Sequence, residues 1–137
     1  MNNQDFDYQA FFELTSILLK SQNELAKRRM FFFKAAINHQ TFKVFKTPEK
    51  QIPCGYVLWA NVSDESVKYL ARTDASLRFP HEWNEGDNTL IMDIVFLSSW
   101  RKLNVCQLRK FLKTKKNLVY RDRYGEMREF VRKGWMV

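Results

Sequence analysis

The apolar residues in the N-terminal part of the chain recur at helical spacing. An amphipathic helix is predicted over 7–20, because its large apolar residues are three or four positions apart: Phe11, Leu14, Ile17 and Leu18. The next stretch, 21–40, is rich in helix-forming residues, so a second helix is predicted there with residues 30–33 as its buried part. The first forty residues are therefore expected to be helical.

Short apolar runs between turn residues follow. The runs TFKVFKT (41–47) and CGYVLWANV (54–62) predict the two strands of a hairpin with a proline-bracketed connection. The segment 64–71 is predicted to be a short helix that is capped by Ser63 or Asp64.

The last third of the chain alternates between strand and helix patterns. TLIMDIVFL (89–97) predicts a buried strand, and LVYRD and MREFVRK predict a closing hairpin around Tyr124–Gly125. A helix is predicted over 99–113, with its cations facing outward and these residues facing inward: Leu103, Val105, Leu108, Phe111 and Leu112. This order indicates an α+β domain around a mixed sheet, with N-terminal helices and a basic helix after the central strand.

Composition narrows the class of protein. The 137 residues, 45% of them hydrophobic, suffice for a packed core, so we expect a single domain over 1–137. No apolar run approaches the roughly 20 residues that span a bilayer, and the polar N-terminus is unlike a secretory signal. The two cysteines have no zinc-type spacing, which predicts reduced thiols and no metal site. A cytoplasmic protein is favoured.

The net charge of +8 is unevenly distributed. The first fourteen residues carry only acidic charges, whereas Lys and Arg far outnumber Asp and Glu from Arg101 onward. A basic surface of this kind attracts a polyanion, which can be nucleic acid, an anionic membrane or an acidic protein. Composition does not choose among these partners.

One carboxylate, Asp93, interrupts the most apolar predicted strand. An unpaired buried charge is costly, so this residue is expected to be paired, neutralised or used in chemistry. Simple alternation predicts that it shares a face with Ile91, Val95 and Leu97. A half-buried carboxylate there is suited to orienting an imidazole or holding a proton. Pairing with a buried arginine or capping a turn is the alternative.

The junction after this strand is a candidate anion site. Free amides and the dipole at a helix start favour negative charge. Ser98 and Ser99 form the junction, and Arg101 and Lys102 lie in the first predicted turn, where cations do not help the helix itself. These four residues are predicted to bind a phosphate. The alternative is that Ser99 is an ordinary cap and the cations are solvated.

Several segments, taken in order, resemble one family. GYVLWANVSDESVKYL, EWNEGD and LIMDIVFL are similar to the toxin-activating lysine acyltransferases, the haemolysin-activating proteins encoded beside RTX toxins. LRKFL and GEMREF extend the resemblance, which covers about residues 35–134.

The resemblance implies a GNAT-like acyltransferase fold and a cytoplasmic enzyme. Such an enzyme takes a fatty acyl group from the phosphopantetheine thioester of acyl carrier protein, with no permanently bound cofactor. It transfers the group to an internal lysine of a toxin or bacteriocin-like protein. The carrier is acidic, which suits the basic C-terminal half of this chain. The family's essential aspartate falls on Asp93, the phosphate of the donor would meet the junction, and a homodimer is possible.

The chain also departs from the family pattern. The family's catalytic histidine falls near Ser21, and His39 is the nearest candidate to replace it. Two other functions stay open. One is a catalytically impaired relative that binds an acidic carrier protein or toxin, and the other is a basic nucleic-acid-binding domain.

Overall fold

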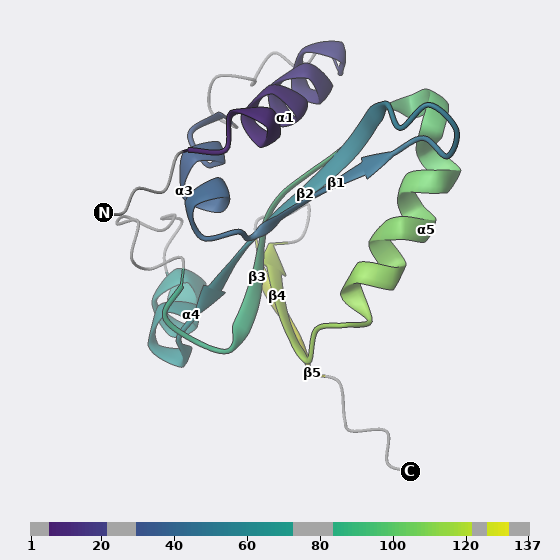
Figure 1. Cartoon of the computed structure of the whole chain (residues 1–137). Coiled ribbons are helices and arrows are strands. Elements are labelled where there is room, and N and C mark those ends of the chain that lie inside the picture. Colours follow the sequence, from purple (N-terminus) through teal and green to yellow (C-terminus); the bar gives the residue numbers. More distant parts are fainter. Residues whose placement is uncertain (1–5, 22–29, 73–83, 122–125, 132–137) are drawn as a thin grey trace.

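The computed structural model describes residues 6–21, 30–72, 84–121 and 126–131. Its elements are α1 (Tyr8–Lys20), α3 (Phe33–Asn38), β1 (Phe42–Lys46), β2 (Pro53–Val62), α4 (Asp64–Arg72), β3 (Asn88–Phe96), η2 (Ser98–Trp100), α5 (Arg101–Leu112), β4 (Asn117–Arg121) and β5 (Met127–Val131) (Figure 1). All five strands lie within about two residues of the predicted runs. The predicted cap of α4 is confirmed, because the Ser63 hydroxyl accepts a hydrogen bond from the Ser66 amide at 3.1 Å.

The five strands form one mixed sheet in the order β1-β2-β3-β4-β5. Neighbouring strands are antiparallel except for β3 and β4, which are parallel. A parallel pair needs a crossover between its strands, and α5 supplies it. Both predicted hairpins, β1–β2 and β4–β5, are confirmed as antiparallel pairs. The turn expected at 124–125 lies outside the described residues.

Helices cover both faces of this sheet, and each face has its own core. On one face α1, α3 and α4 pack over a cluster that includes Leu14, Phe33, Tyr56, Leu58 and Val67. On the other face α5 packs, through Phe111, over Phe45, Cys54, Val57 and Trp59. Figure 1 shows α1 and α3 on one side of the sheet and α5 on the other. This α+β architecture confirms the expected mixed sheet and is consistent with a GNAT-like fold.

Two carboxylates stabilise the first helix, one at its start and one where it packs against the sheet. The Asp7 carboxylate accepts a hydrogen bond from the Ala10 amide at 3.0 Å, which satisfies one free donor of the helix start. One turn further on, the side chain of Glu13 is only 12% exposed and forms an ion pair of 2.8 Å with Lys46. This pair links α1 to β1 and was not predicted, because the sequence pattern does not indicate which acid on a helix turns inward.

A buried asparagine holds α5 against β2. Asn104 is fully buried, and its Nδ2 donates to the Cys54 carbonyl at 3.0 Å. A Cβ at Gly55 would lie only 2.4 Å from Asn104 Oδ1, so glycine at this position permits the close approach. Burial raises the pKa of the Cys54 thiol, which keeps that thiol protonated between the helix and the strand.

Two predictions about side chains are wrong, and the start of one helix differs from the prediction by two residues. Phe31, expected to be buried, is 82% exposed, because it lies in a turn before α3 and does not follow the helical spacing. Val105, expected to face inward, lines the outer side of α5. Helix α5 begins at Arg101, because Ser98–Trp100 form a separate turn of 3-10 helix.

The structure tests two further predictions only within the described residues. Of the helix predicted over 21–40, the described part contains α3, and residues 22–29 lie outside the description. No described helix combines the length and the apolar character that crossing a bilayer requires.

Candidate active site

Asp93 lies on the sheet face that α1 and α3 cover, because β3 contains a β-bulge. Asp93 pairs with Leu58, whereas Ile91 pairs with the next residue of β2, Trp59, so Met92 is an extra residue. One extra residue reverses the alternation of side chains along a strand. Ile91 accordingly packs toward α5, and the prediction that it shares a face with Asp93 is wrong.

A buried tyrosine binds the Asp93 carboxylate. The Tyr56 hydroxyl donates a hydrogen bond to Oδ2 at 2.7 Å, and Tyr56 is fully buried whereas Asp93 is half-buried. The Tyr56 ring meets the ring of Phe33 edge to face with centroids 5.6 Å apart, and Phe33 meets Phe11 at 6.1 Å in the same way. Side chains of α1 and α3 therefore fix the phenol that holds the carboxylate.

Tyr56 was not predicted as a site residue, although the sequence contains a signal for it. It stands in the continuous apolar run 56–59 of a predicted strand, which predicts burial on both faces and so a buried ring. A buried tyrosine hydroxyl needs a hydrogen-bond partner. Asp93 is the polar residue of the most apolar strand, so the two residues form a natural pair.

His39 ends the helix that covers the same sheet face. It is the C-cap of α3, and the following Gln40 has a φ of 56°, the left-handed conformation that commonly terminates a helix. The chain then enters β1 at Phe42, which lies opposite Leu58, which in turn lies opposite Asp93. His39 therefore lies on the same side of the sheet as Asp93, close to a strand two positions away from β3.

Ser21, where the resemblance implies a histidine, has a structural role. It is the C-cap of α1, and its hydroxyl donates to the Leu18 carbonyl at 2.6 Å. The last carbonyls of a helix have no partner within the helix, so this bond satisfies one of them.

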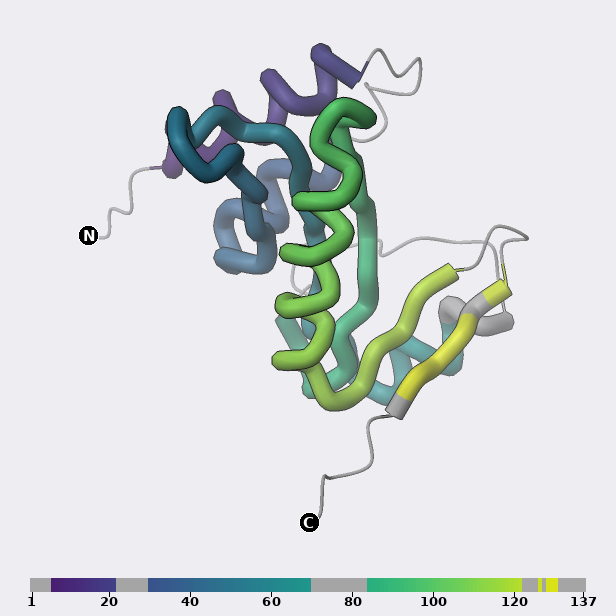
Figure 2. The backbone as a smooth tube through the Cα atoms, turned by 90° about the vertical axis from the view of Figure 1, so that its right-hand side faces the viewer, coloured from purple at the N-terminus to yellow at the C-terminus, as the bar shows by residue number. Residues whose placement is uncertain are grey.

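The parallel strands β3 and β4 separate close to Asp93. In the described residues they pair over 89–90 and 118–119, although β3 continues to Phe96 and β4 to Arg121. Figure 2 shows the two strands diverging beyond this short contact. Asp93 lies three residues past the last paired position of β3. A strand edge without a neighbour offers backbone donors and acceptors to an extended ligand.

The junction at the end of β3 is exposed to solvent. Ser98 and Ser99 belong to the 3-10 turn, and the N-cap of α5 is Trp100, with no side-chain hydrogen bond at this position. The alternative in which Ser99 caps the helix is therefore wrong. Arg101 and Lys102 follow as exposed residues of the first turn.

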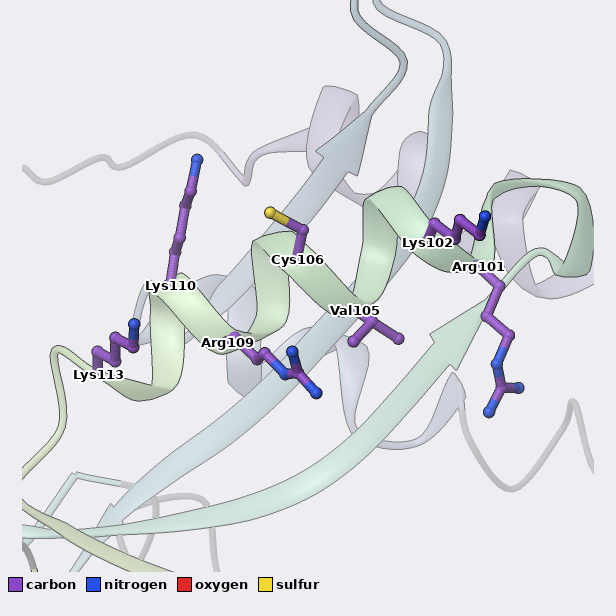
Figure 3. A pocket seen from close by; sticks show the side chains of 7 residues that line it. All are labelled: Arg101, Lys102, Val105, Cys106, Arg109, Lys110 and Lys113. Carbon is purple, nitrogen blue, oxygen red and sulfur yellow. The ribbon is translucent and has the colours of Figure 1, made fainter.

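The outer side of α5 carries a shallow groove. Its volume is about 600 Å³, and Figure 3 shows its lining from this one helix: Arg101, Lys102, Val105, Cys106, Arg109, Lys110 and Lys113. Because α5 and Asp93 lie on opposite faces of the sheet, the groove and the carboxylate do not form one pocket. The sheet separates the predicted phosphate-binding residues Arg101 and Lys102 from the predicted catalytic residues Asp93 and His39.

These parts define what the arrangement can do chemically. A carboxylate that a phenol orients can accept or hold a proton, and the part of β3 beyond its pairing with β4 has backbone groups that could bind an extended chain. The junction of Ser98 and Ser99 lies at the far end of the same strand, about 17 Å away at the usual rise of about 3.3 Å per residue. In the described residues no group of three or more His, Cys, Asp or Glu side chains could hold a metal ion.

Comparison with known proteins identifies one family. The model of the RTX toxin acyltransferase family matches residues 17–132, a range that includes all five strands, α3 and α5. None of the curated proteins compared with the chain matches it.

Proposed function

Because the chain belongs to the RTX toxin acyltransferase family, we propose that it moves a fatty acyl group from acyl carrier protein to an internal lysine of a toxin or bacteriocin-like protein. The lysine Nζ attacks the carbonyl carbon of the thioester. A C–N bond forms while the C–S bond breaks, and the thiol of the carrier leaves with the proton that the amine loses. The observation that carries the proposal is Asp93, bound by Tyr56, beside the gap between β3 and β4.

The donor arm follows β3 from the junction to the carboxylate. The phosphate of phosphopantetheine binds at Ser98, Ser99, Arg101 and Lys102, where exposed hydroxyls and two cations gather. The arm then lies extended in the gap, and amide groups of the arm bond to the unpaired edges of β3 and β4. The length of strand between the junction and Asp93 is comparable to the length of an extended phosphopantetheine arm.

The bulge in β3 adds a second element to this site. The extra residue of a bulge is left out of the ladder, and here that residue is Met92, directly before Asp93. A backbone amide at this position is suited to bind the thioester oxygen, where negative charge develops during attack.

Asp93 and His39 are the proposed proton-transfer residues. A lysine amine is protonated at neutral pH and must lose a proton before it attacks. Both residues lie on the α1 and α3 side of the sheet, Asp93 beside the gap and His39 near β1, two strands away, so an amine in the gap would meet Asp93 first. The Tyr56 hydrogen bond holds one oxygen of Asp93 and so orients the carboxylate.

Mass spectrometry tests the reaction directly. The protein is incubated with acyl-loaded carrier protein and a candidate RTX toxin, and a fatty-acyl mass increment is sought on a toxin lysine. Asp93→Asn keeps the side-chain shape and is expected to lower the transfer rate by about a hundredfold or more, and His39→Gln by about tenfold or more.

The matched control is Asp87→Asn, since Asp87 is exposed in the loop before β3 and its rate should equal that of the native protein. Thermal unfolding of each variant separates a lost proton carrier from a lost fold. Native-like transfer by Asp93→Asn would show that the catalytic assignment is wrong.

A second candidate function is carrier binding without transfer. The hydroxyl of Ser21 is occupied by the Leu18 carbonyl at the position of the family's histidine, which favours a relative with impaired catalysis. Tight binding of acyl-loaded carrier with no acyl increment on any lysine is the expected result for this second function.

A further inference from the structure

We propose that the outer groove of α5 is the docking surface for one acidic helix of the carrier protein. This inference rests on the proposed function for the identity of the partner. The groove itself rests on independent observations, which are the arrangement of its side chains, their exposure and their charge.

The lining side chains form two parallel rows along the helix. Arg101, Val105, Arg109 and Lys113 are spaced by four residues, and so are Lys102, Cys106 and Lys110. Figure 3 shows Lys102, Cys106 and Lys110 pointing to one side of the groove, and Arg101, Val105 and Arg109 pointing to the other. Rows at this spacing are the ridges by which helices pack, and a ridge of a second helix fits between them.

Each row has cations at both ends and one small or apolar residue between them, Val105 (followed by Arg109) in one row and Cys106 in the other. Val105 is half-buried, and Cys106 is exposed. Helix α5 has 12 residues, so at about 1.5 Å per residue the rows extend over about 18 Å, or three turns of a partner helix. The complementary partner is a helix with acidic side chains at both ends of its contact and an apolar side chain at the centre.

The cations of the groove are not neutralised by α5. The helix contains no acidic residue; Arg101 and Lys102 oppose the helix dipole in the first turn, whereas Arg109 and Lys110 lie in the last turn, where the dipole favours cations. Arg109 and Lys113 are four residues apart, a spacing at which like charges repel. None of the five cations forms an ion pair with another residue in the described part of the chain. An acidic partner would remove this repulsion on binding.

A helix fits this surface better than a single-stranded nucleic acid does. Single-stranded nucleic acids are bound by aromatic side chains that alternate with cations, because the bases need rings on which to stack. The lining of the groove contains no aromatic side chain.

The Arg101 end of the groove adjoins the junction at Ser98 and Ser99. A carrier that docks here therefore has its arm beside the start of the proposed path along β3.

The protein contains a natural probe for this surface. Of its two cysteines, Cys106 is exposed in the middle of the groove, whereas Cys54 is buried on the other side of α5 and its pKa is raised by burial. A maleimide reagent should therefore modify the folded protein at Cys106 alone. Carrier protein that seats on the groove should slow this reaction.

The experiment measures the rate of Cys106 modification and the Kd for apo carrier protein, which has no phosphopantetheine arm. Saturating carrier is expected to slow the modification about tenfold or more. Arg109→Glu with Lys110→Glu is expected to raise Kd about tenfold or more at low ionic strength, and high salt should weaken binding by the native protein. The matched control, Lys34→Glu with Lys68→Glu, makes the same charge change on exposed positions of α3 and α4 and should leave Kd unchanged.

Three outcomes would overturn the inference. In the first, the carrier binds while Cys106 stays fully reactive. In the second, the groove variant and the native protein bind the carrier with equal Kd. In the third, an unrelated oligonucleotide protects Cys106 more strongly than the carrier does at equal salt. Both readouts use the apo carrier and need no acyl transfer. Failure of the transfer reaction would therefore count against the proposed function and leave the docking result interpretable.

Discussion

At the scale of single residues, the site depends on a carboxylate that is held in an apolar strand. A charge there is tolerated when hydrogen bonds replace water, and the Tyr56 hydroxyl at 2.7 Å supplies one such bond to Asp93. The tyrosine in turn is oriented by the edge-to-face contact with Phe33. The carboxylate is therefore positioned through two layers of side chains, from the sheet to α3.

The Tyr56→Phe variant tests this positioning. Removal of one hydroxyl takes away a hydrogen bond to a charged group, which is typically worth about 1.5–3 kcal/mol. We expect kcat to fall about tenfold or more and KM for the acyl-loaded carrier to stay the same, because the ring and its contact with Phe33 remain. Steady-state kinetics with both parameters resolved is the measurement, and an unchanged kcat would contradict a positioning role.

At the scale of elements, helix α5 has two different sides. Its inner side is fixed by Asn104, which reaches the backbone of β2 where Gly55 leaves room. Its outer side carries the cations of the groove, of which Arg101 and Lys102 oppose the helix dipole in the first turn whereas Arg109 and Lys110 favour it in the last turn. Packing on the sheet, through residues such as Phe111, holds the inner side of α5 in place.

The Gly55→Ala variant tests the contact between α5 and β2. The added Cβ would overlap Asn104 Oδ1 at 2.4 Å, so the free energy of unfolding should fall by about 1–3 kcal/mol. Chemical denaturation measures this loss. In an Asn104→Ala background the same substitution should cost less, since the overlapping atom is gone. Equal costs in the two backgrounds would show that Asn104 does not set the constraint.

At the scale of the whole molecule, the sheet separates the proposed catalytic residues from the proposed docking surface. Asp93, Tyr56 and the C-cap of α3 lie on one face, and the groove lies beyond the other face. The gap between β3 and β4 is the proposed connection, because it leads from the junction near α5 to the carboxylate. In the proposed function a carrier protein remains outside while its arm delivers the thioester to the amine.

This separation predicts that the two sets of residues act independently. In the double variant Tyr56→Phe with Arg109→Glu, the change in carrier Kd should match that of Arg109→Glu alone. The change in single-turnover rate at saturating carrier should match that of Tyr56→Phe alone. Distant sites without shared partners usually add within about 0.5 kcal/mol. A larger coupling would contradict the separation by the sheet.

Most elements of the fold, and part of the site, follow from the sequence. Strands and helices such as β2 and α1 are indicated by spacings of two or of three to four residues, which are local properties. Asp93 stands out because it is the charged residue of an apolar run. The partnership with Tyr56 and the outward position of Val105 were missed, since neighbours in space and the exact rotation of a helix depend on packing between distant segments.

The sequence by itself determined the α+β class, the basic C-terminal half and the acid inside the central strand, because all three follow from local composition and periodicity. Only the tertiary structure decided which face Asp93 occupies, since the bulge at Met92 becomes visible in the pairing of β3 with β2. It also decided that the cations of α5 lie across the sheet from the carboxylate. That relation is set by the crossover of the chain between two parallel strands, which no local pattern specifies.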